Sequence, residues 1–139
     1  MLIRPRILRR SDAVRRLVQE TWLTPDDFIV PLFIDEGENV KEEIASMPNY
    51  YRRSLDLTLK EVKELWAMGL KTVLLFVKVP DGLKDNYGKE ALNTEGLMQR
   101  AIRAIQDAVP DMCVMTDVAL DHASAKLERS AATVFYSVR

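Results

Sequence analysis

The order of three short apolar runs, with helix-like segments between them, limits the fold of this chain most strongly. The runs occupy residues 28–34, 72–77 and 112–116, and polar or helix-breaking residues bound each of them. Continuous apolar runs of this length are typical of strands that are buried on both faces of a sheet. A strand, helix, strand, helix, strand order predicts an α/β fold with a right-handed parallel sheet.

Two segments between these runs have the apolar spacing of an amphipathic helix. The first contains Thr58 and Glu61, whose spacing matches a capping box and predicts that a helix begins there. The second begins at Asn93 or Thr94 and has its own apolar stripe. Residues 35–54 are charged, contain glycine and proline, and show no sustained period, so we predict a long loop.

The first 22 residues are predicted to lie outside the sheet. Residues 1–10 are basic and interrupted by Pro5, which is typical of an arm rather than of a core element. Ser11 is suited to cap a short helix, because a serine hydroxyl accepts a hydrogen bond from a free amide of the first turn. The apolar stripe of that helix would consist of Val14, Leu17 and Val18.

Composition excludes several classes of partner. The 20 basic and 21 acidic residues are interleaved and give a net charge of −1, which argues against nucleic acid or an acidic membrane as the main partner.

The single cysteine, Cys113, cannot form an intramolecular disulfide and is expected to be a small buried apolar residue. The sequence has no long apolar span and no signal-peptide pattern, so we expect a cytoplasmic protein.

The third apolar run ends in carboxylates, which makes it the first place to look for chemistry. Asp117 follows this run directly, and Asp121 lies four residues further on. An unpaired buried charge is costly, so carboxylates at the end of a buried strand need a reason. The C-terminal ends of parallel strands are where ligands bind in barrels and in open α/β sheets. The sequence therefore predicts a site around Asp117.

Together, these segments resemble the porphobilinogen synthase family, also called δ-aminolevulinic acid dehydratase. The resemblance covers residues 4–121 almost without a gap, and no single segment would be convincing alone. It is carried by RPRILRR (4–10), DFIVPLFI (27–34), SMPNYYR (46–52), LLFVKVP (74–80), KD (84–85), EALN (90–93), LMQRAIR (97–103) and TDVALD (116–121).

The resemblance implies a partial (β/α)8 TIM barrel, consisting of the first three βα units and preceded by an N-terminal arm. Residues 1–22 would form the arm and its short helix, residues 23–121 the three units, and residues 122–139 a tail that does not match. Members of the family condense two molecules of 5-aminolevulinate into porphobilinogen, the pyrrole unit of haem and other tetrapyrroles. The arm wraps a neighbouring subunit in a homo-oligomer, usually an octamer.

The resemblance also implies roles for particular residues. Asp117 matches an active-site aspartate, expected near substrate or metal; the alternative is a structural aspartate that caps a neighbouring loop. Ala119 and Asp121 occupy positions where zinc-dependent members have cysteines, so catalytic zinc is not expected. Asp121 is instead a candidate ligand for Mg²⁺ or a monovalent cation, because these hard ions prefer oxygen donors. No other cofactor is expected.

The lysines that form Schiff bases in the family lie on later strands, beyond residue 121. Lys78 stands at a strand end, but it matches a different position, so a solvated charge is the expected role. We therefore expect these 139 residues to be inactive when tested alone. The first βα loop would contain Tyr50, Tyr51, Arg52 and Arg53. These side chains could face the barrel mouth, but we expect them to pack against the barrel and anchor the loop.

The tail leaves two interpretations open. Loss of the resemblance after Asp121 is typical of a frameshifted or truncated gene product, but it also fits a divergent short protein. His122, the only histidine, falls in the tail and is expected to be an ordinary surface residue. The alternative function is a non-catalytic module that joins full-length subunits through its arm. A stand-alone ligand-binding domain is disfavoured, because no glycine-rich phosphate loop follows any strand.

Overall fold

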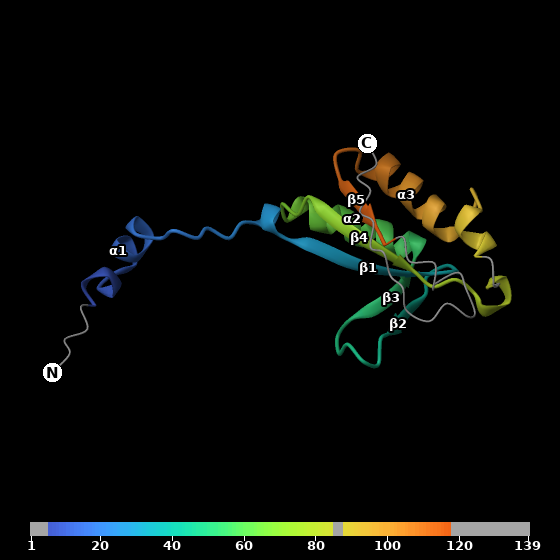
Figure 1. Ribbon diagram of the computed structural model, residues 1–139, viewed down its shortest axis with the longest axis horizontal. Coiled ribbons are helices and arrows are strands. Elements are labelled where there is room, and N and C mark those ends of the chain that lie inside the picture. Colours follow the sequence, from blue (N-terminus) through green and yellow to red (C-terminus); the bar gives the residue numbers. More distant parts are fainter. Residues whose placement is uncertain (1–5, 85–87, 118–139) are drawn as a thin grey trace.

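The computed structural model describes residues 6–84 and 88–117 and contains one five-stranded sheet of order β2-β3-β1-β4-β5 (Figure 1). β1 pairs in parallel with β3 and β4, and β4 pairs in parallel with β5, while β2 is antiparallel to β3. The three predicted strands are therefore confirmed as adjacent parallel strands. The strands are β1 (Ile29–Asp35), β2 (Lys41–Glu43), β3 (Tyr51–Ser54), β4 (Thr72–Val77) and β5 (Cys113–Thr116).

Two helices, α2 (Leu55–Ala67) and α3 (Leu97–Ala108), pack against one face of this sheet. Side chains alternate between the two faces of a strand, so every second residue of each central strand points toward the helices. The resulting core is fully or almost fully buried, and each large member contributes about 1.5–3 kcal/mol of apolar burial. It includes Leu32, Ile34, Val62, Val73, Leu75, Ala101, Ile105 and Val114.

The opposite face of the sheet carries the intervening residues and is only half-buried. In β1 and β4 these include Phe33 and Phe76, and in β5 they include Cys113 and Met115. No described helix covers this face, because α2 and α3 both contact the other one. In a closed barrel this face would be the interior.

The structure corrects the prediction of a structureless loop over residues 35–54. This segment contains β2 and β3, and β3 extends the sheet beyond β1. The two strands have three and four residues and consist mainly of charged and aromatic side chains, so they produced no apolar run. Their stability comes from pairing with β1, which cannot be recognised from local sequence.

Both helix starts also differ from the prediction. α2 begins at Leu55 with Ser54 at its N-cap, so Thr58 does not cap the helix. The Thr58 side chain is buried in the first turns, and its hydroxyl donates a hydrogen bond to the Ser54 carbonyl at 3.0 Å. α3 begins at Leu97, after a short 3₁₀ turn over Lys89–Leu92, rather than at residue 93 or 94.

The N-terminal arm extends away from the sheet (Figure 1). It contains a 3₁₀ turn (Ile7–Arg9) and the helix α1 (Asp12–Leu17), and neither has a buried residue. The predicted cap is confirmed, because Ser11 Oγ accepts a hydrogen bond from the Val14 amide at 3.3 Å. A second 3₁₀ turn, Pro25–Asp27, precedes β1. Within residues 6–84 and 88–117, no helix is long and apolar enough to cross a membrane.

Candidate functional site

One row of side chains crosses the half-buried face of the sheet near the C-terminal ends of its strands. The register places Arg52 of β3 beside Phe33 of β1, and Phe33 beside Phe76 of β4. Leu75 pairs with Thr116, so the next residues, Phe76 and Asp117, are neighbours as well. The row therefore has a cation at one end, a carboxylate at the other and two phenylalanines between them. The phenyl rings are stacked, with centroids 5.1 Å apart and an interplanar angle of 15°.

Asp117 is placed where the sequence predicts it, directly after β5. Its side chain is half-buried, and its Oδ1 atom is buried without a hydrogen-bond partner among the described residues. A buried carboxylate oxygen without a partner is costly and rare, and such atoms are usually satisfied by a ligand, an ion or another part of the protein. The position of Asp117 fits the expected active-site aspartate, and that role stays a prediction.

Lys78 and Asp35 form the next row toward the C-terminal ends of the strands. Lys78 Nζ lies 3.1 Å from Asp35 Oδ2, and the Lys78 amide donates to the Ile34 carbonyl at 2.9 Å. Asp35 is mostly buried, with 17% of its side chain exposed, whereas 53% of the Lys78 side chain is exposed. A nucleophilic lysine must be neutral, and a carboxylate partner favours the charged form. The expected role of Lys78 as a charge at a strand end therefore fits this geometry.

The segment of residues 50–53 divides its side chains between the two faces. Tyr50 donates a hydrogen bond from its hydroxyl to the Pro31 carbonyl and packs edge-on against Phe33, with centroids 5.7 Å apart. Burial raises the pKa of Tyr50, and the charge of Glu61 adds to that increase. Arg53 points the other way and forms an ion pair of 2.7 Å with Glu61 of α2. Loop anchoring is thus served by Tyr50 and Arg53.

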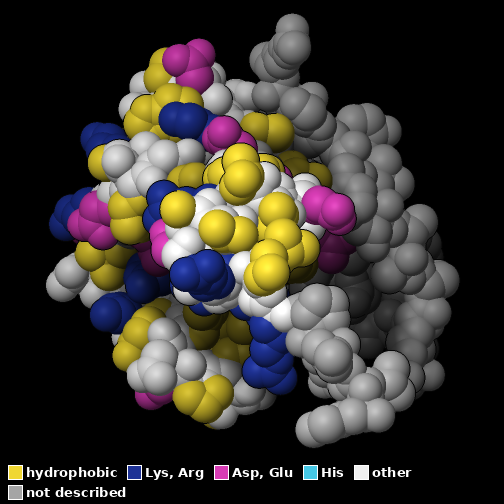
Figure 2. All heavy atoms as spheres, turned by 90° about the vertical axis from the view of Figure 1, so that its left-hand side faces the viewer, with side chains coloured by type: hydrophobic (Ala, Val, Ile, Leu, Met, Phe, Trp, Pro, Cys, Tyr) yellow, Lys and Arg dark blue, Asp and Glu magenta, His cyan; other side chains and the backbone are white. Residues whose placement is uncertain are grey.

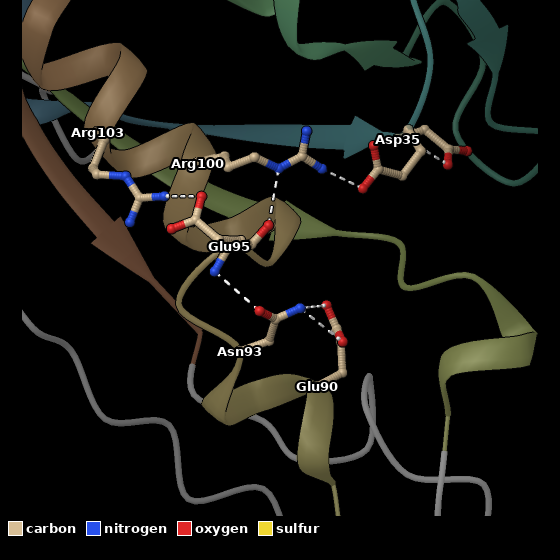
Figure 3. A network of polar contacts seen from close by, with 7 residues as sticks. Asp35, Glu90, Asn93, Glu95, Arg100 and Arg103 are labelled. Atoms are coloured by element: carbon tan, nitrogen blue, oxygen red, sulfur yellow. Dashed lines mark hydrogen bonds and ion pairs between the residues drawn. The ribbon is translucent and has the colours of Figure 1, made fainter.

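A polar network connects the end of β1 to the start of α3 (Figure 3). Arg100 forms an ion pair with Glu36, the residue that follows β1, and its Nε donates to the Glu95 carbonyl at 3.1 Å. The Glu95 amide donates to Asn93 Oδ1 at 3.0 Å, and Asn93 Nδ2 donates to Glu90 Oε1 at 3.0 Å. The network holds the segment before α3 against the edge where β1 and β4 end.

An open cavity of about 230 Å³ lies at this edge of the half-buried face. The phenyl rings of Phe33 and Phe76 contribute apolar surface to it. The charged residues that line it are all cationic: Arg52, Lys78 and Lys84. Asp35, which pairs with Lys78, does not line the cavity. The lining of the cavity therefore suits a ligand in which an anionic group is attached to a small apolar part.

The expected cation site cannot be assigned to the residues that the structure describes. Asp121, Ala119 and His122 lie outside them, as does the whole tail over residues 122–139. Residues 6–84 and 88–117 contain no group of three or more His, Cys, Asp and Glu side chains that could hold a metal ion. Asp117 offers one oxygen ligand that is unpaired within the described part of the chain, and one ligand alone makes a weak site. Binding of Mg²⁺ or a monovalent cation at Asp121 stays a prediction.

Sequence reasoning missed Asp35, Glu36 and Arg100 as parts of this edge. A usable signal was present, because Asp35 ends the first apolar run much as Asp117 follows the third. The ion pair between Glu36 and Arg100 joins residues 64 positions apart, so no local pattern could predict it.

Comparisons with known proteins identify one family that matches most of this chain. The family model of delta-aminolevulinic acid dehydratase matches residues 2–127, which include the predicted 4–121 and also residues 122–127 of the tail. The enzyme of that name from Chlamydia pneumoniae is 46% identical over 118 residues, covering 85% of this chain and 36% of the relative. The chloroplastic enzyme from Selaginella martensii is 48% identical over 119 residues, covering 85% and 28%.

The fold is matched by a crystal structure of delta-aminolevulinic acid dehydratase (porphobilinogen synthase) from Toxoplasma gondii ME49 in complex with the reaction product porphobilinogen. The TM-score is 0.83 at 43% sequence identity, and the match covers 90% of this chain and 35% of that one. The chain thus spans roughly a third of the length of the relatives that it matches. The family model covers most of the chain, and the three predicted strands, β1, β4 and β5, are neighbours in the sheet in their order along the chain. The chain therefore belongs to the delta-aminolevulinic acid dehydratase family.

Proposed function

We propose that this chain provides the first three βα units of a porphobilinogen synthase, which condenses two molecules of 5-aminolevulinate into porphobilinogen. The observation that carries the proposal is the position of Asp117, directly after β5, with a buried oxygen that has no partner among the described residues. The match to the product-bound Toxoplasma gondii enzyme supports the choice of substrate. In this role Asp117 lies beside the substrate, and the stacked pair of Phe33 and Phe76 excludes water from one side of it.

The 139 residues are expected to be inactive when tested alone, because none of their lysines matches a Schiff-base position of the family. A lysine amine forms a Schiff base only when its environment keeps it neutral. Lys78, which directly follows β4, forms an ion pair with Asp35. Activity would therefore need the later strands of a barrel.

Complementation of a split barrel tests this proposal. The chain is co-expressed with the remaining two-thirds of the Chlamydia pneumoniae relative, and porphobilinogen is measured by its colour reaction. We expect turnover from the pair, none from either part alone, and none from a pair that carries Asp117→Ala. The positive control is the Chlamydia pneumoniae enzyme divided at the same point. An active control beside an inactive hybrid would contradict the proposal.

A second candidate function is a non-catalytic module that joins full-length subunits through the arm. The supporting observation is that the arm exposes large apolar side chains, with Ile7 73%, Leu17 84% and Trp22 63% exposed. Seen from the end of the molecule formed by the arm, apolar side chains gather among charged ones (Figure 2). Exposed apolar surface of this kind marks an interaction site.

The test of this second function is co-purification with a complete homologue. We expect capture by the full chain and loss of capture when residues 1–10 are deleted. Equal capture by both would contradict an arm-mediated role.

A homo-oligomer built through the arm, an octamer in the family, is part of the same proposal. The cytoplasm is the proposed compartment, and the free thiol of Cys113 fits a reducing environment.

A further inference from the structure

The segment that precedes α3 is held in place with almost no apolar burial. We call residues 88–96 the rim segment, because they lie beside the edge where β1 and β4 end (Figure 3). Its buried residues are two glycines, Gly88 and Gly96, and its largest apolar side chain, Leu92, is 84% exposed. Apolar burial is the main stabilising term in most folded segments, so a segment without it opens locally at low cost.

Side chains of α3 hold the rim segment instead. Three of them donate hydrogen bonds to its carbonyl groups: Gln99 to Ala91 at 3.2 Å, Arg100 to Glu95 at 3.1 Å and Arg103 to Thr94 at 2.9 Å. The packing there is close, because a Cβ atom added at Gly96 would lie 3.0 Å from the Asn93 carbonyl oxygen. α3 itself is fixed to the sheet by its buried core residues, so it forms a firm base for the rim segment.

Arg100 also connects the rim segment to the sheet. Its guanidinium forms an ion pair with Glu36, in the loop that follows β1, while its Nε atom donates to the Glu95 carbonyl. A guanidinium is planar and has donors on different edges, so it can serve two acceptors in two directions. The side chains of Arg100 and Glu36 are 40% and 42% exposed, so water and salt compete for this ion pair.

We propose that Arg100 acts as a latch between the loop after β1 and the rim segment, and that breaking its ion pair with Glu36 lets the rim segment open by local unfolding. Opening would uncover the edge of the sheet at which the cavity lies. In a synthase, as proposed above, this motion would control access to the cavity. The latch itself consists of described residues, and it does not depend on that proposed function.

Hydrogen exchange of backbone amides in the full 139-residue chain tests the latch. The reporters are the amides of Asn93 and Gly96, which donate within the rim segment to the carbonyls of Glu90 and Asn93 at 3.1 and 3.0 Å. The reference is the Val109 amide, which donates to the Ile105 carbonyl at 2.8 Å. Raising the ionic strength from about 0.01 M to about 1 M shortens the Debye length from about 30 Å to about 3 Å. We expect the reporters to exchange at least about twofold faster relative to the reference.

Variants then assign the effect to one ion pair. Arg100→Met keeps the apolar stem and removes both polar contacts, so the reporters should exchange about two- to fivefold faster. Glu36→Gln should have a similar or smaller effect, and because both changes break the same pair, the double variant should exchange no faster than Arg100→Met. The matched control is Arg16→Met, which removes an arginine that pairs with Asp12 at 2.8 Å in the arm. It should leave the reporters unchanged.

Any of four results would overturn the proposal. These are reporters that exchange in the unchanged chain as fast as in an unstructured peptide, exchange that does not depend on salt, unchanged exchange in folded Arg100→Met, and independent effects of Arg100→Met and Glu36→Gln. The salt series uses the unchanged chain, so it remains decisive if a variant fails to fold. A salt-sensitive latch together with an inactive split-barrel hybrid would contradict the enzyme and support the latch.

Discussion

Lys78 Nζ lies 3.1 Å from Asp35 Oδ2, and this contact joins the ends of β1 and β4 across 43 positions of sequence. Asp35 also accepts a hydrogen bond at Oδ1 from the Glu36 amide at 2.9 Å. Both carboxylate oxygens of a mostly buried aspartate are thus used, while the half-exposed side chain of Lys78 has Asp35 as its one ion-pair partner among the described residues. The two partners should therefore differ in their effect on stability.

Lys78→Met should lower the free energy of unfolding more than Asp35→Ala. The first change leaves the mostly buried carboxylate of Asp35 with one unpaired oxygen, at a cost of about 1–3 kcal/mol. The second removes that carboxylate and leaves a half-exposed lysine that water solvates, at a cost of about 0–1 kcal/mol. Urea denaturation of both variants and of the double variant measures the coupling. An Asp35→Ala variant less stable than Lys78→Met would contradict this assignment.

Asp117→Asn should leave the stability of the chain unchanged or raise it by up to about 1 kcal/mol. The reason is that one buried oxygen of the carboxylate has no partner to lose among the described residues. Removing the charge also removes the cost of keeping it half-buried. Thermal and urea unfolding check this expectation. A clear destabilisation would reveal a structural partner of Asp117 and weaken the case for a functional aspartate.

Ile105→Ala should destabilise the chain by about 2–5 kcal/mol, because it leaves a cavity between α3 and the sheet. Ile105 is fully buried in the core that holds both helices to the sheet. Leu92→Ala is the matched control, since the Leu92 side chain is 84% exposed, and it should change stability by less than about 0.5 kcal/mol. Urea midpoints measure both, and similar values would contradict this core assignment.

Protonation of Asp56 should lower the stability of the chain in acid. A hydrogen bond from the Ser54 hydroxyl at 2.5 Å, together with the Asn39 amide, holds the pKa of Asp56 below its usual 3.8. Its contribution is therefore present above about pH 3.8 and is lost as the pH falls through the lower folded value. Asp56→Asn should flatten the acid limb of the curve of stability against pH. An unchanged acid limb would contradict the role of this cluster at the start of α2.

Protonation of Glu61 should have the opposite effect and favour the folded state. Burial raises the pKa of Glu61 above its usual 4.5, and Arg53 only partly offsets that effect. A raised folded pKa means that protonation favours the folded state, fully so below pH 4.5 and less as the pH rises through the folded value. Relative to Glu61→Gln, the unchanged chain should therefore gain stability as the pH falls toward 4.5. A difference that does not depend on pH would show that Glu61 is not desolvated.

Local pattern predicted the elements whose apolar residues are continuous or periodic. β1, β4 and β5 coincide with the three apolar runs, and the Ser11 cap lies where predicted. The prediction was wrong over residues 35–54, where β2 and β3 consist of charged and aromatic residues. It was also wrong at Thr58, because a capping-box spacing cannot distinguish an N-cap from a residue one turn inside the helix. The place of Asp117 at the end of a buried strand was predicted from the sequence, and its active-site role stays a prediction, whereas the cationic lining of the cavity was not predictable.

The sequence by itself determined the strand and helix order, and with it the parallel sheet, because periodicity and strand length are properties of short segments. It also determined that carboxylates follow buried strands. Only the tertiary structure decided which groups meet: Lys78 with Asp35, Arg100 with Glu36, and Arg52 with the stacked phenylalanines. The register between neighbouring strands determines which of these side chains come into contact. A shift of one strand by one residue would move each of its side chains to the opposite face of the sheet. Register depends on the whole packed sheet, so no segment encodes it alone.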